Sequence, residues 1–243
     1  RMEQKAKGEK DEPIVIEEFP GLEGEVAWDP RPISRKGSER VINFAFDLAR
    51  HRENKLGTPQ SVTCVDKSNV TRGCRLFRKI FTEISEANPD IDTDAAYIDA
   101  FTMWLMRDPE DLDVVVLPNM FGDIATDLAS VLQGGLGMAA SANMGPKHMM
   151  FEPVHGSAPK YTGQNVVNPI AMLQSVQLMF EALAYRKKDE ELDKCADILQ
   201  QAIQQHFEEG GIVTYDLGGD ASTSDIGQAI ANRCETLIQQ EFH

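Results

Sequence analysis

Short β-branched runs alternate with amphipathic segments over residues 61–133, and this order restricts the fold more than any other feature. The runs SVTCVD at 61–66 and LDVVVLP at 112–118 are typical of buried strands, and a shorter strand is expected at about 95–98. A helix is expected after each of these strands. The β-α-β-α order therefore predicts an α/β fold with a substantial sheet.

Helical spacing of apolar residues predicts the remaining elements. Ser38 is expected to cap a first helix whose buried face carries Val41, Phe44, Ala45 and Leu48. The other helices are expected at about 74–84, 100–107, 124–133, 169–185, 192–203 and 226–237, the last with Asp225 in its first turn. Residues 134–168 are rich in Gly, Ala, Ser, Pro and Asn and are interpreted as a functional or disordered loop, with a domain crossover near Gly134.

The charge balance excludes several classes of partner. The chain carries 39 Asp and Glu against 24 Lys and Arg, a formal net charge of −15, whereas nucleic acids and anionic membranes bind basic patches. No apolar run approaches the ~20 residues of a membrane span, and no signal-peptide pattern is found, so a cytoplasmic protein is expected. Four cysteines without CxxC spacing indicate neither a zinc site nor a disulfide framework.

NMFGDIATD at 119–127 is the strongest local signal for chemistry. Asp123 and Asp127 are four residues apart at the expected start of a helix, which puts both carboxylates on one face. Like charges at this spacing repel unless a cation lies between them, and Mg²⁺ binds one or two carboxylates together with substrate oxygens. The alternative interpretation is a helix whose acidic residues only favour its positive N-terminus.

Two loops carry further candidates. Lys67 follows the first strand, where α/β enzymes place functional groups, and a partly buried lysine beside a cation can act as a base. A solvated surface charge is the alternative. In FEPVHGSAPKYTGQNVVNP at 151–169, His155 and backbone amides suit a nucleotide, while Lys160 and Tyr161 suit its phosphate. A glycine-rich surface loop with a structural histidine is the alternative there.

Two other patterns are rejected. Residues 135–140 match GxGxxA, but the dinucleotide motif needs a strand before it and a helix after it, and here a helix precedes it and a loop follows. No GxSxG surrounds Ser157, and no cysteine has a histidine nearby in the sequence, so covalent catalysis is not supported.

Taken in order, the motifs resemble those of the β-decarboxylating dehydrogenases, the isocitrate and 3-isopropylmalate dehydrogenase family. The resemblance rests on VDKSNV (65–70), YID (97–99), NMFGDIATD, GGLGMAASANMG (134–145), the 151–169 loop and TYDLGGDASTSD (214–225). It extends from about Gly37 to the last helix and implies the family's two-domain, non-Rossmann α/β fold. Residues 1–133 would form the small domain, with a clasp-like arm at about 1–34 and dimer-forming helices, and 134–243 the C-terminal part of the large, cofactor-binding domain.

The resemblance also implies roles for individual residues. Asp123, Asp127 and Asp99 would bind the metal, and Lys67 and Asp99 would be catalytic. Lys67 and Asp99 would reach into the site of a partner subunit, so that activity requires a homodimer. The cofactor-binding residues that the resemblance implies are Asn69, His155, Gly156, Ser157, Ala158, Lys160, Tyr161, Asn168 and Tyr215.

The implied reaction is the oxidative decarboxylation of a 2-hydroxy acid with NAD(P)⁺ and Mg²⁺ or Mn²⁺. Lys67 would help to remove the hydroxyl proton while hydride passes to the cofactor, and CO₂ would then leave the β-keto acid. Family members that use NAD tend to carry an acidic residue at the position of Lys160, whereas Lys160 and Tyr161 are similar to the pair of NADP-dependent isocitrate dehydrogenases. NADP is therefore expected, with NAD as the alternative.

The substrate is less constrained. SANMG at 141–145 favours isocitrate, while 3-isopropylmalate, homoisocitrate, a tartrate- or malate-type acid and a non-catalytic subunit or fragment remain alternatives. No tyrosine of the chain lies in the context of the family's catalytic tyrosine, and the arginines that grip the substrate have no match. Because the chain begins with Arg1, it is expected to be part of a longer protein and inactive by itself.

Overall fold

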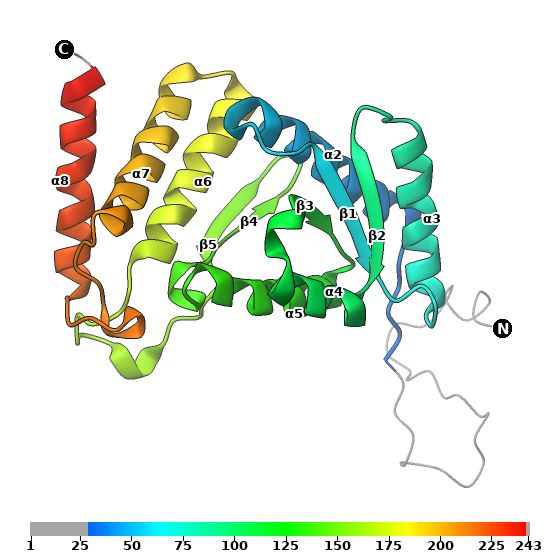
Figure 1. Cartoon of the computed structure of the whole chain (residues 1–243), viewed down its shortest axis with the longest axis horizontal. Helices are drawn as coiled ribbons and strands as arrows, with labels where there is room; N and C mark the ends of the chain where they lie inside the picture. The colour runs from blue at the N-terminus through cyan, green and yellow to red at the C-terminus, as the bar shows by residue number, and fades with distance from the viewer. Residues whose placement is uncertain (1–28, 242–243) are drawn as a thin grey trace, which may run out of the picture.

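Three parallel strands form the sheet that carries the candidate site (Figure 1). The structure is a computed structural model and describes residues 29–241. In the sheet, β1 (Ser61–Asp66) lies between β2 (Asp92–Tyr97) and β3 (Val114–Val116). The three predicted strands are present, although β2 begins ahead of the predicted 95–98. The clasp-like arm predicted at about 1–34 falls almost wholly outside the described residues.

The register of the sheet brings the ends of the strands to one edge. Asp66 is paired with Tyr97 across β1 and β2, and Cys64 with Val116 across β1 and β3. Because all three strands are parallel, the segments that follow them leave from the same side. Every segment that carries a predicted catalytic or metal-binding residue, whether loop or helix, begins at this edge.

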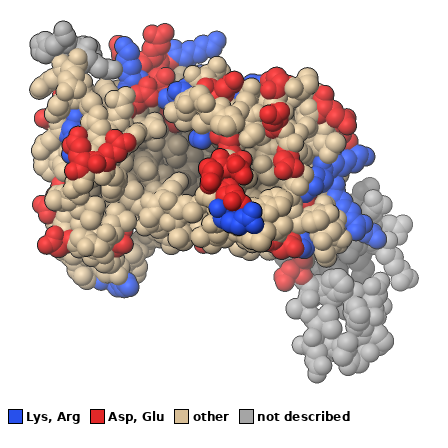
Figure 2. All heavy atoms as spheres, in the orientation of Figure 1, with Lys and Arg blue, Asp and Glu red and all other residues tan. Residues whose placement is uncertain are grey.

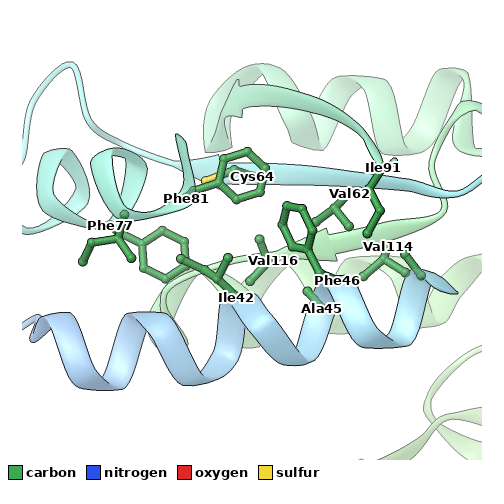
Figure 3. Packing of buried hydrophobic residues seen from close by; sticks show 12 residues of the cluster. Ile42, Ala45, Phe46, Val62, Cys64, Phe77, Phe81, Ile91, Val114 and Val116 are labelled. Carbon is green, nitrogen blue, oxygen red and sulfur yellow. The ribbon is translucent and has the colours of Figure 1, made fainter. Parts of the chain in front are cut away.

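Helices α2 (Arg35–Leu56) and α3 (Arg72–Glu86) cover one face of the sheet. Their apolar residues form one cluster with β1 and β3, as Figure 3 shows. The rings of Phe46 and Phe81 lie 5.8 Å apart within it. Burial of these aliphatic and aromatic side chains supplies the main favourable free energy of this half of the chain.

Two details of the α2 prediction are wrong. The cap is Ser34, whose Oγ accepts a hydrogen bond from the Gly37 N–H at 3.2 Å, while Ser38 is buried and donates its hydroxyl to the Ser34 carbonyl at 2.9 Å. The buried face is also rotated, because Val41 and Phe44 are 41% and 44% exposed. The residues that pack on the sheet are instead Ile42, Ala45, Phe46 and Ala49, which have the i, i+3, i+4, i+7 spacing of one helical face.

Helices α4 (Ile98–Arg107) and α5 (Asn119–Ser130) pack together on the other face, where Phe101, Leu105 and Ala125 are buried. The predicted start of α5 at 124 is wrong. Pro118 precedes the first helical residue, and Gly122 is helical and does not form a turn. No acidic residue lies in the first turn of α5. The favourable interaction of an acidic side chain with the helix dipole is confined to the first turn, so it does not explain Asp123 and Asp127.

The segment interpreted as a loop contains a β-hairpin. β4 (Ala140–Met144) and β5 (Met149–Pro153) pair antiparallel, and both pack on α6 (Ile170–Lys187). The loop prediction is therefore wrong for these residues, although the predicted α6 is present. β4 (ASANM) contains two alanines and an asparagine, residue types of low strand propensity, so its pairing depends on the helix that covers it.

Three helices stand side by side after the hairpin (Figure 1). The sequence predicts all three helices, and in the structure α6 packs against α7 (Glu190–Glu208) and α7 against α8 (Thr223–Glu241). Ile170, Ile203, Ile226 and Ile230 are buried among them. Short 3-10 turns complete the chain: η1 (Pro109–Asp111), η2 (Val131–Gln133), η3 (Leu136–Met138), η4 (Pro159–Tyr161) and η5 (Tyr215–Leu217). None of the helices within 29–241 is long and apolar enough to cross a membrane.

An ionic cluster ties α2 to α6 and α7. The Lys55 ammonium lies 3.4 Å from Glu181, 3.1 Å from Asp193 and 2.8 Å from Asp197. His51 Nε2 lies 3.2 Å from the same Glu181. Burial alone would lower the pKa of Lys55, but hydrogen bonds to Asp197 and Asp193 and the nearby Glu181 outweigh burial and raise it above its usual value.

Lys55→Met is expected to lower the free energy of unfolding by about 1–2 kcal/mol at neutral pH, because three carboxylates lose their shared cation. A raised pKa in the folded state stabilises below the unfolded-state value of 10.5, and this contribution is lost as pH rises through the higher folded value. Urea unfolding of wild type and variant at several pH values measures the difference in their free energies of unfolding. If that difference stayed constant above pH ~11, the contribution assigned to the Lys55 charge would be contradicted.

Candidate active site

The carboxyl ends of the strands deliver the first group of candidate residues. β1 leads into Lys67, β2 leads into α4 with Asp99 in its first turn, and β3 leads through Pro118 into α5 with Asp123 and Asp127. Open parallel sheets bind ligands at this edge, because the loops that follow neighbouring strands meet there. The fold thus places all four predicted side chains on segments that begin at one edge.

Lys67 and Asp99 are in direct contact. The lysine ammonium donates a hydrogen bond to Asp99 Oδ1 and lies 5.9 Å from the centre of the Tyr97 ring. The side chains are 25% and 65% exposed, so the lysine is partly buried. The Lys67 ammonium holds the pKa of the Asp99 carboxyl below its usual range. This edge of the sheet therefore holds a lysine–carboxylate pair that a small molecule can reach.

Asp123 and Asp127 lie exposed on α5. Asn119 Nδ2 donates a hydrogen bond to Asp123 Oδ2 at 3.1 Å. Within residues 29–241, no three His, Cys, Asp or Glu side chains are gathered in a position to hold a metal ion. Asp99, the third predicted ligand, is not gathered with the α5 pair in a single chain. The donors are nonetheless carboxylate oxygens, which Mg²⁺ and Mn²⁺ prefer and use one or two at a time beside substrate oxygens, so their chemistry fits a divalent ion.

A second group of residues gathers around two 3-10 turns. Lys160 and Tyr161 lie in η4, and Tyr215 opens η5. The rings of Tyr161 and Tyr215 are 5.9 Å apart between centroids, and the Lys160 ammonium lies 4.6 Å from the Tyr161 ring centre. A hydrogen bond from Tyr215, together with the nearby Lys160, lowers the pKa of Tyr161, while the same bond raises the pKa of Tyr215.

These tyrosines line an open pocket of about 240 Å³. Val166, Asp220 and Ala221 complete its lining. The lysine and the two hydroxyl groups are suited to a phosphate, whereas the Asp220 carboxylate opposes one. The family resemblance implied cofactor-binding roles for Lys160, Tyr161 and Tyr215, and the structure places these three side chains together.

The small residues before η4 are open to solvent. His155 Nδ1 lies 2.8 Å from the Gly156 carbonyl oxygen, which orients the ring. Gly156 has open space around its Cα, and Ser157 is exposed. Ala158 has a φ of 42°, in the left-handed region, so the chain turns sharply into η4. These residues form an accessible loop beside the tyrosine pocket.

Asn168, unlike the exposed loop residues before η4, is buried. Its side chain accepts a hydrogen bond from the Ile170 N–H at 3.0 Å and donates one to Asp216 Oδ2 at 3.1 Å. A Cβ at Gly137 would lie 2.7 Å from the same Asp216 oxygen. Gly137, part of the rejected GxGxxA pattern, therefore permits close packing against Asp216 and Asn168. The segment after that pattern forms strand β4, where a loop was expected. The Asn168 amide is used inside the chain, and Asn69, by contrast, is exposed beside Lys67.

Asp66 and Arg78 were missed by sequence analysis. Asp66 is fully buried at the end of β1, and Arg78 of α3 binds both of its carboxylate oxygens at 3.0 and 3.1 Å. The available signal was an acidic residue at the end of the buried SVTCVD run, because a buried carboxylate needs a partner. The spacing of residues along the sequence does not say which of the many arginines supplies it.

Comparison with known proteins relates the chain to a family. The family model described as isocitrate/isopropylmalate dehydrogenase matches residues 5–230. The chain belongs to the isocitrate/isopropylmalate dehydrogenase family. The resemblance stated from its motifs and the expected α/β fold are thereby confirmed.

Curated relatives within this family are substantially longer. A 3-isopropylmalate/3-methylmalate dehydrogenase of Methanocaldococcus jannaschii is 41% identical over 222 residues, which are 88% of this chain and 63% of that protein. A homoisocitrate dehydrogenase of the same organism is 41% identical over 212 residues, 87% of this chain and 57% of that protein. The chain thus spans about 57–63% of the length of these relatives.

Solved structures of the family are similar in fold. An isocitrate dehydrogenase from Methylococcus capsulatus has a TM-score of 0.75 and 37% identity, over 84% of this chain and 57% of that one. A β-decarboxylating dehydrogenase from Thermococcus kodakarensis has a TM-score of 0.75 and 35% identity, over 89% and 60% of the two chains. The family's fold therefore extends over most of the described residues.

Proposed function

We propose that the protein containing this chain is a dehydrogenase that oxidises and decarboxylates a 2-hydroxy acid with NADP and a divalent metal ion. The observation that supports this most is the Lys67–Asp99 pair at the sheet edge from which α5, with Asp123 and Asp127, also begins. A proton-transfer group beside hard oxygen ligands suits removal of a hydroxyl proton and stabilisation of an enolate.

The substrate is the part of the proposal that changes most from the sequence analysis. Isocitrate was placed first there, but the similar curated proteins carry mainly isopropylmalate and homoisocitrate names. Isocitrate itself is represented by one of the similar solved structures. We therefore place 3-isopropylmalate or a close 3-alkylmalate first, homoisocitrate second and isocitrate third.

In the proposed reaction, Lys67 Nζ moves the proton of the substrate's 2-hydroxyl group. Asp99 accepts a hydrogen bond from that nitrogen and holds it at the strand edge. Asp123, Asp127 and Asp99 would hold the metal ion, which when bound supplies Lewis-acid polarisation of substrate oxygens. Proximity matters here, because a hydroxyl group loses its proton efficiently only to a base within hydrogen-bond reach.

Two copies of the chain are proposed to build each site. Lys67 and Asp99 are already paired within one copy, and Asp99 is not gathered with Asp123 and Asp127 into a metal-binding group, which suits a site shared between subunits. Packed helices α4 and α5 and the adjacent η2 also expose large apolar side chains, a feature of protein interfaces. The exposed residues are Met103, Trp104, Met106, Met120, Ile124, Val131 and Leu132. We infer a homodimer joined along this surface, and a boundary between small and large domains near Gly134.

NADP is proposed over NAD because Lys160 lies beside the tyrosine pocket. Lys160→Asp is expected to reverse the preference by about 100-fold or more in kcat/KM, since a carboxylate repels the 2′-phosphate and accepts the ribose hydroxyl groups. Steady-state kinetics with both cofactors measures the ratio. The exposed Lys147→Asp serves as a control of equal charge change, and an unaltered ratio in Lys160→Asp would contradict the assignment.

The proposed function is tested by following reduction of NADP and NAD by the intact protein with Mg²⁺ or Mn²⁺. The acids to compare are 3-isopropylmalate, homoisocitrate, isocitrate, malate and tartrate. We expect one of the first three to give metal-dependent turnover with release of CO₂. Absence of turnover with every acid, in a protein shown to be folded, would favour a non-catalytic member of the family.

A further inference from the structure

The buried pair of Asp66 and Arg78 adjoins the proposed catalytic lysine. Asp66 is the residue before Lys67 and has no exposed surface. Arg78 Nε donates to Asp66 Oδ2 at 3.0 Å, and Nη2 donates to Oδ1 at 3.1 Å. Such a two-bond pair fixes both the distance and the orientation of the two groups.

Arg78 also connects the ends of two strands. The same Nη2 donates a hydrogen bond to the carbonyl oxygen of Ala96 at 2.9 Å, and the guanidinium carbon lies 5.9 Å from the centre of the Tyr97 ring. In the register of the sheet, Asp66 and Tyr97 are directly paired. One side chain of α3 therefore sets how the end of β1 lies against the end of β2. These two ends lead directly into Lys67 and Asp99.

The backbone of Lys67 is held on both sides. The Ser68 N–H donates to Asp66 Oδ1 at 2.8 Å, so one carboxylate fixes the residues before and after the lysine. The Lys67 carbonyl oxygen accepts hydrogen bonds from the N–H groups of Val70 and Thr71 at 3.0 and 2.9 Å. These bonds fix the position of the Lys67 backbone, from which its side chain reaches Asp99.

Stability alone does not explain this arrangement. Replacing a buried ion pair by apolar residues of similar volume is often neutral or stabilising, so such a pair is better explained by the geometry it imposes. We propose that Arg78 is a positioning residue, which acts through Asp66 and the Ala96 carbonyl to hold Lys67 against Asp99. The inference rests on the proposed function, in which Lys67 transfers the proton.

A second arginine–aspartate pair, in which the aspartate side chain is buried, offers a control. Arg52 Nε binds Asp113 Oδ1 at 2.7 Å, and the Asp113 side chain is almost fully buried. Asp113 precedes β3, so this pair lies at the amino end of that strand and away from the edge that carries Lys67. Arg52→Lys and Arg78→Lys each keep the charge and remove the guanidinium group, which in Arg78 makes a two-bond contact that Lys cannot replace.

The test compares Arg78→Lys with Arg52→Lys in the intact protein, with Lys67→Met as the reference. Arg78→Lys is expected to lower kcat about 100-fold, because displacement of a reacting group by 1 Å has effects of that size. The KM values should change by less than about threefold, since substrate binding is untouched. Amide hydrogen exchange at 67–70 should become about tenfold faster in Arg78→Lys only. Arg52→Lys should lower the melting temperature while leaving kcat and this exchange unchanged.

The outcomes separate the two proposals. If Lys67→Met is inactive but Arg78→Lys keeps wild-type kcat, the positioning role is wrong while the proposed function stands. Equal losses of kcat in Arg78→Lys and Arg52→Lys would also overturn it, since they indicate general destabilisation. If Lys67→Met itself keeps wild-type kcat, the proposed role of Lys67 fails first. Should Arg78→Lys not fold, Asp66→Asn removes the charge at constant shape, and unchanged exchange at 67–70 in that variant would overturn the proposal.

Discussion

Replacing Lys67 by methionine is expected to lower kcat by about 10²–10⁴-fold, the range for loss of a positioned proton-transfer group. Methionine keeps much of the side-chain length but has no proton to exchange. The KM for the hydroxy acid should change far less, because the loss lies mainly in the transition state. Stopped-flow measurement of cofactor reduction, under conditions where the chemical step is slow, reports the effect directly.

Two further variants show whether the proton or the charge of Lys67 matters. Lys67→Arg keeps a positive charge that is never given up near neutral pH, so it should be nearly as inactive as Lys67→Met. Lys79→Met removes an exposed lysine of α3 and should behave as wild type. Wild-type turnover in Lys67→Arg would show that only the charge beside Asp99 is needed, and would remove Lys67 as the base.

Asp123→Asn is the second variant with a large expected effect. It removes one anionic oxygen ligand at nearly constant shape, so Mn²⁺ should bind more weakly and metal-dependent turnover should fall about 10³-fold, several kcal/mol of transition-state stabilisation. Titration of Mn²⁺ by electron paramagnetic resonance measures binding without turnover. The exposed Asp47→Asn of α2 is the control. Wild-type affinity for Mn²⁺ in Asp123→Asn would contradict the metal assignment.

Mixing the two inactive variants tests the shared site. If Lys67 of one copy serves the Asp123 of another, hybrids of Lys67→Met and Asp123→Asn chains contain one intact site of two. Random re-association should then restore about a quarter of the wild-type activity, since half of the dimers are hybrids. Sites built from single chains would give no recovery at all, and sedimentation of the mixture shows whether dimers are present.

Local patterns in the sequence predicted most elements because their residues are close along the chain. The SVTCVD strand, α3 and the three C-terminal helices are present where apolar spacing indicated them. Errors arose where packing outweighs local preference. The face of α2 that meets the sheet is set by Ile42 and Phe46, and the hairpin of β4 and β5 forms under α6 although β4 is rich in residues of low strand propensity.

In the candidate site, too, local motifs predicted some features and tertiary packing determined others. Lys67, Asp123 and Lys160 were identified by their motifs, because each motif is a short run whose chemistry is visible in the run itself. The motifs did not predict the structural surroundings of these residues. The helix that carries Asp123 begins earlier than expected, which removes the explanation of that residue as a helix-end charge. Asn168, chosen as a cofactor ligand, uses its amide to support Ile170 and Asp216.

The structure also shows where the acidic side chains lie and which of them are paired with basic residues. Figure 2 shows acidic side chains outnumbering basic ones on the face viewed, in keeping with the net charge of −15. Several of the acidic side chains are nevertheless paired with a basic one. Lys55 serves three carboxylates at once, and Arg78 serves the buried Asp66. A formal sum of charges therefore says little about the potential at any one site.

By itself the sequence determined the α/β order of elements, the family and the residue types available for catalysis. These follow from periodicity and from motifs, both of which are properties of neighbouring residues. The tertiary structure alone decided that Lys67 meets Asp99, that Arg78 reaches both Asp66 and Ala96, and that Lys55 joins α2 to α6 and α7. Each of these contacts joins positions on different elements, and its partner is selected by strand register and helix packing, which no local pattern encodes.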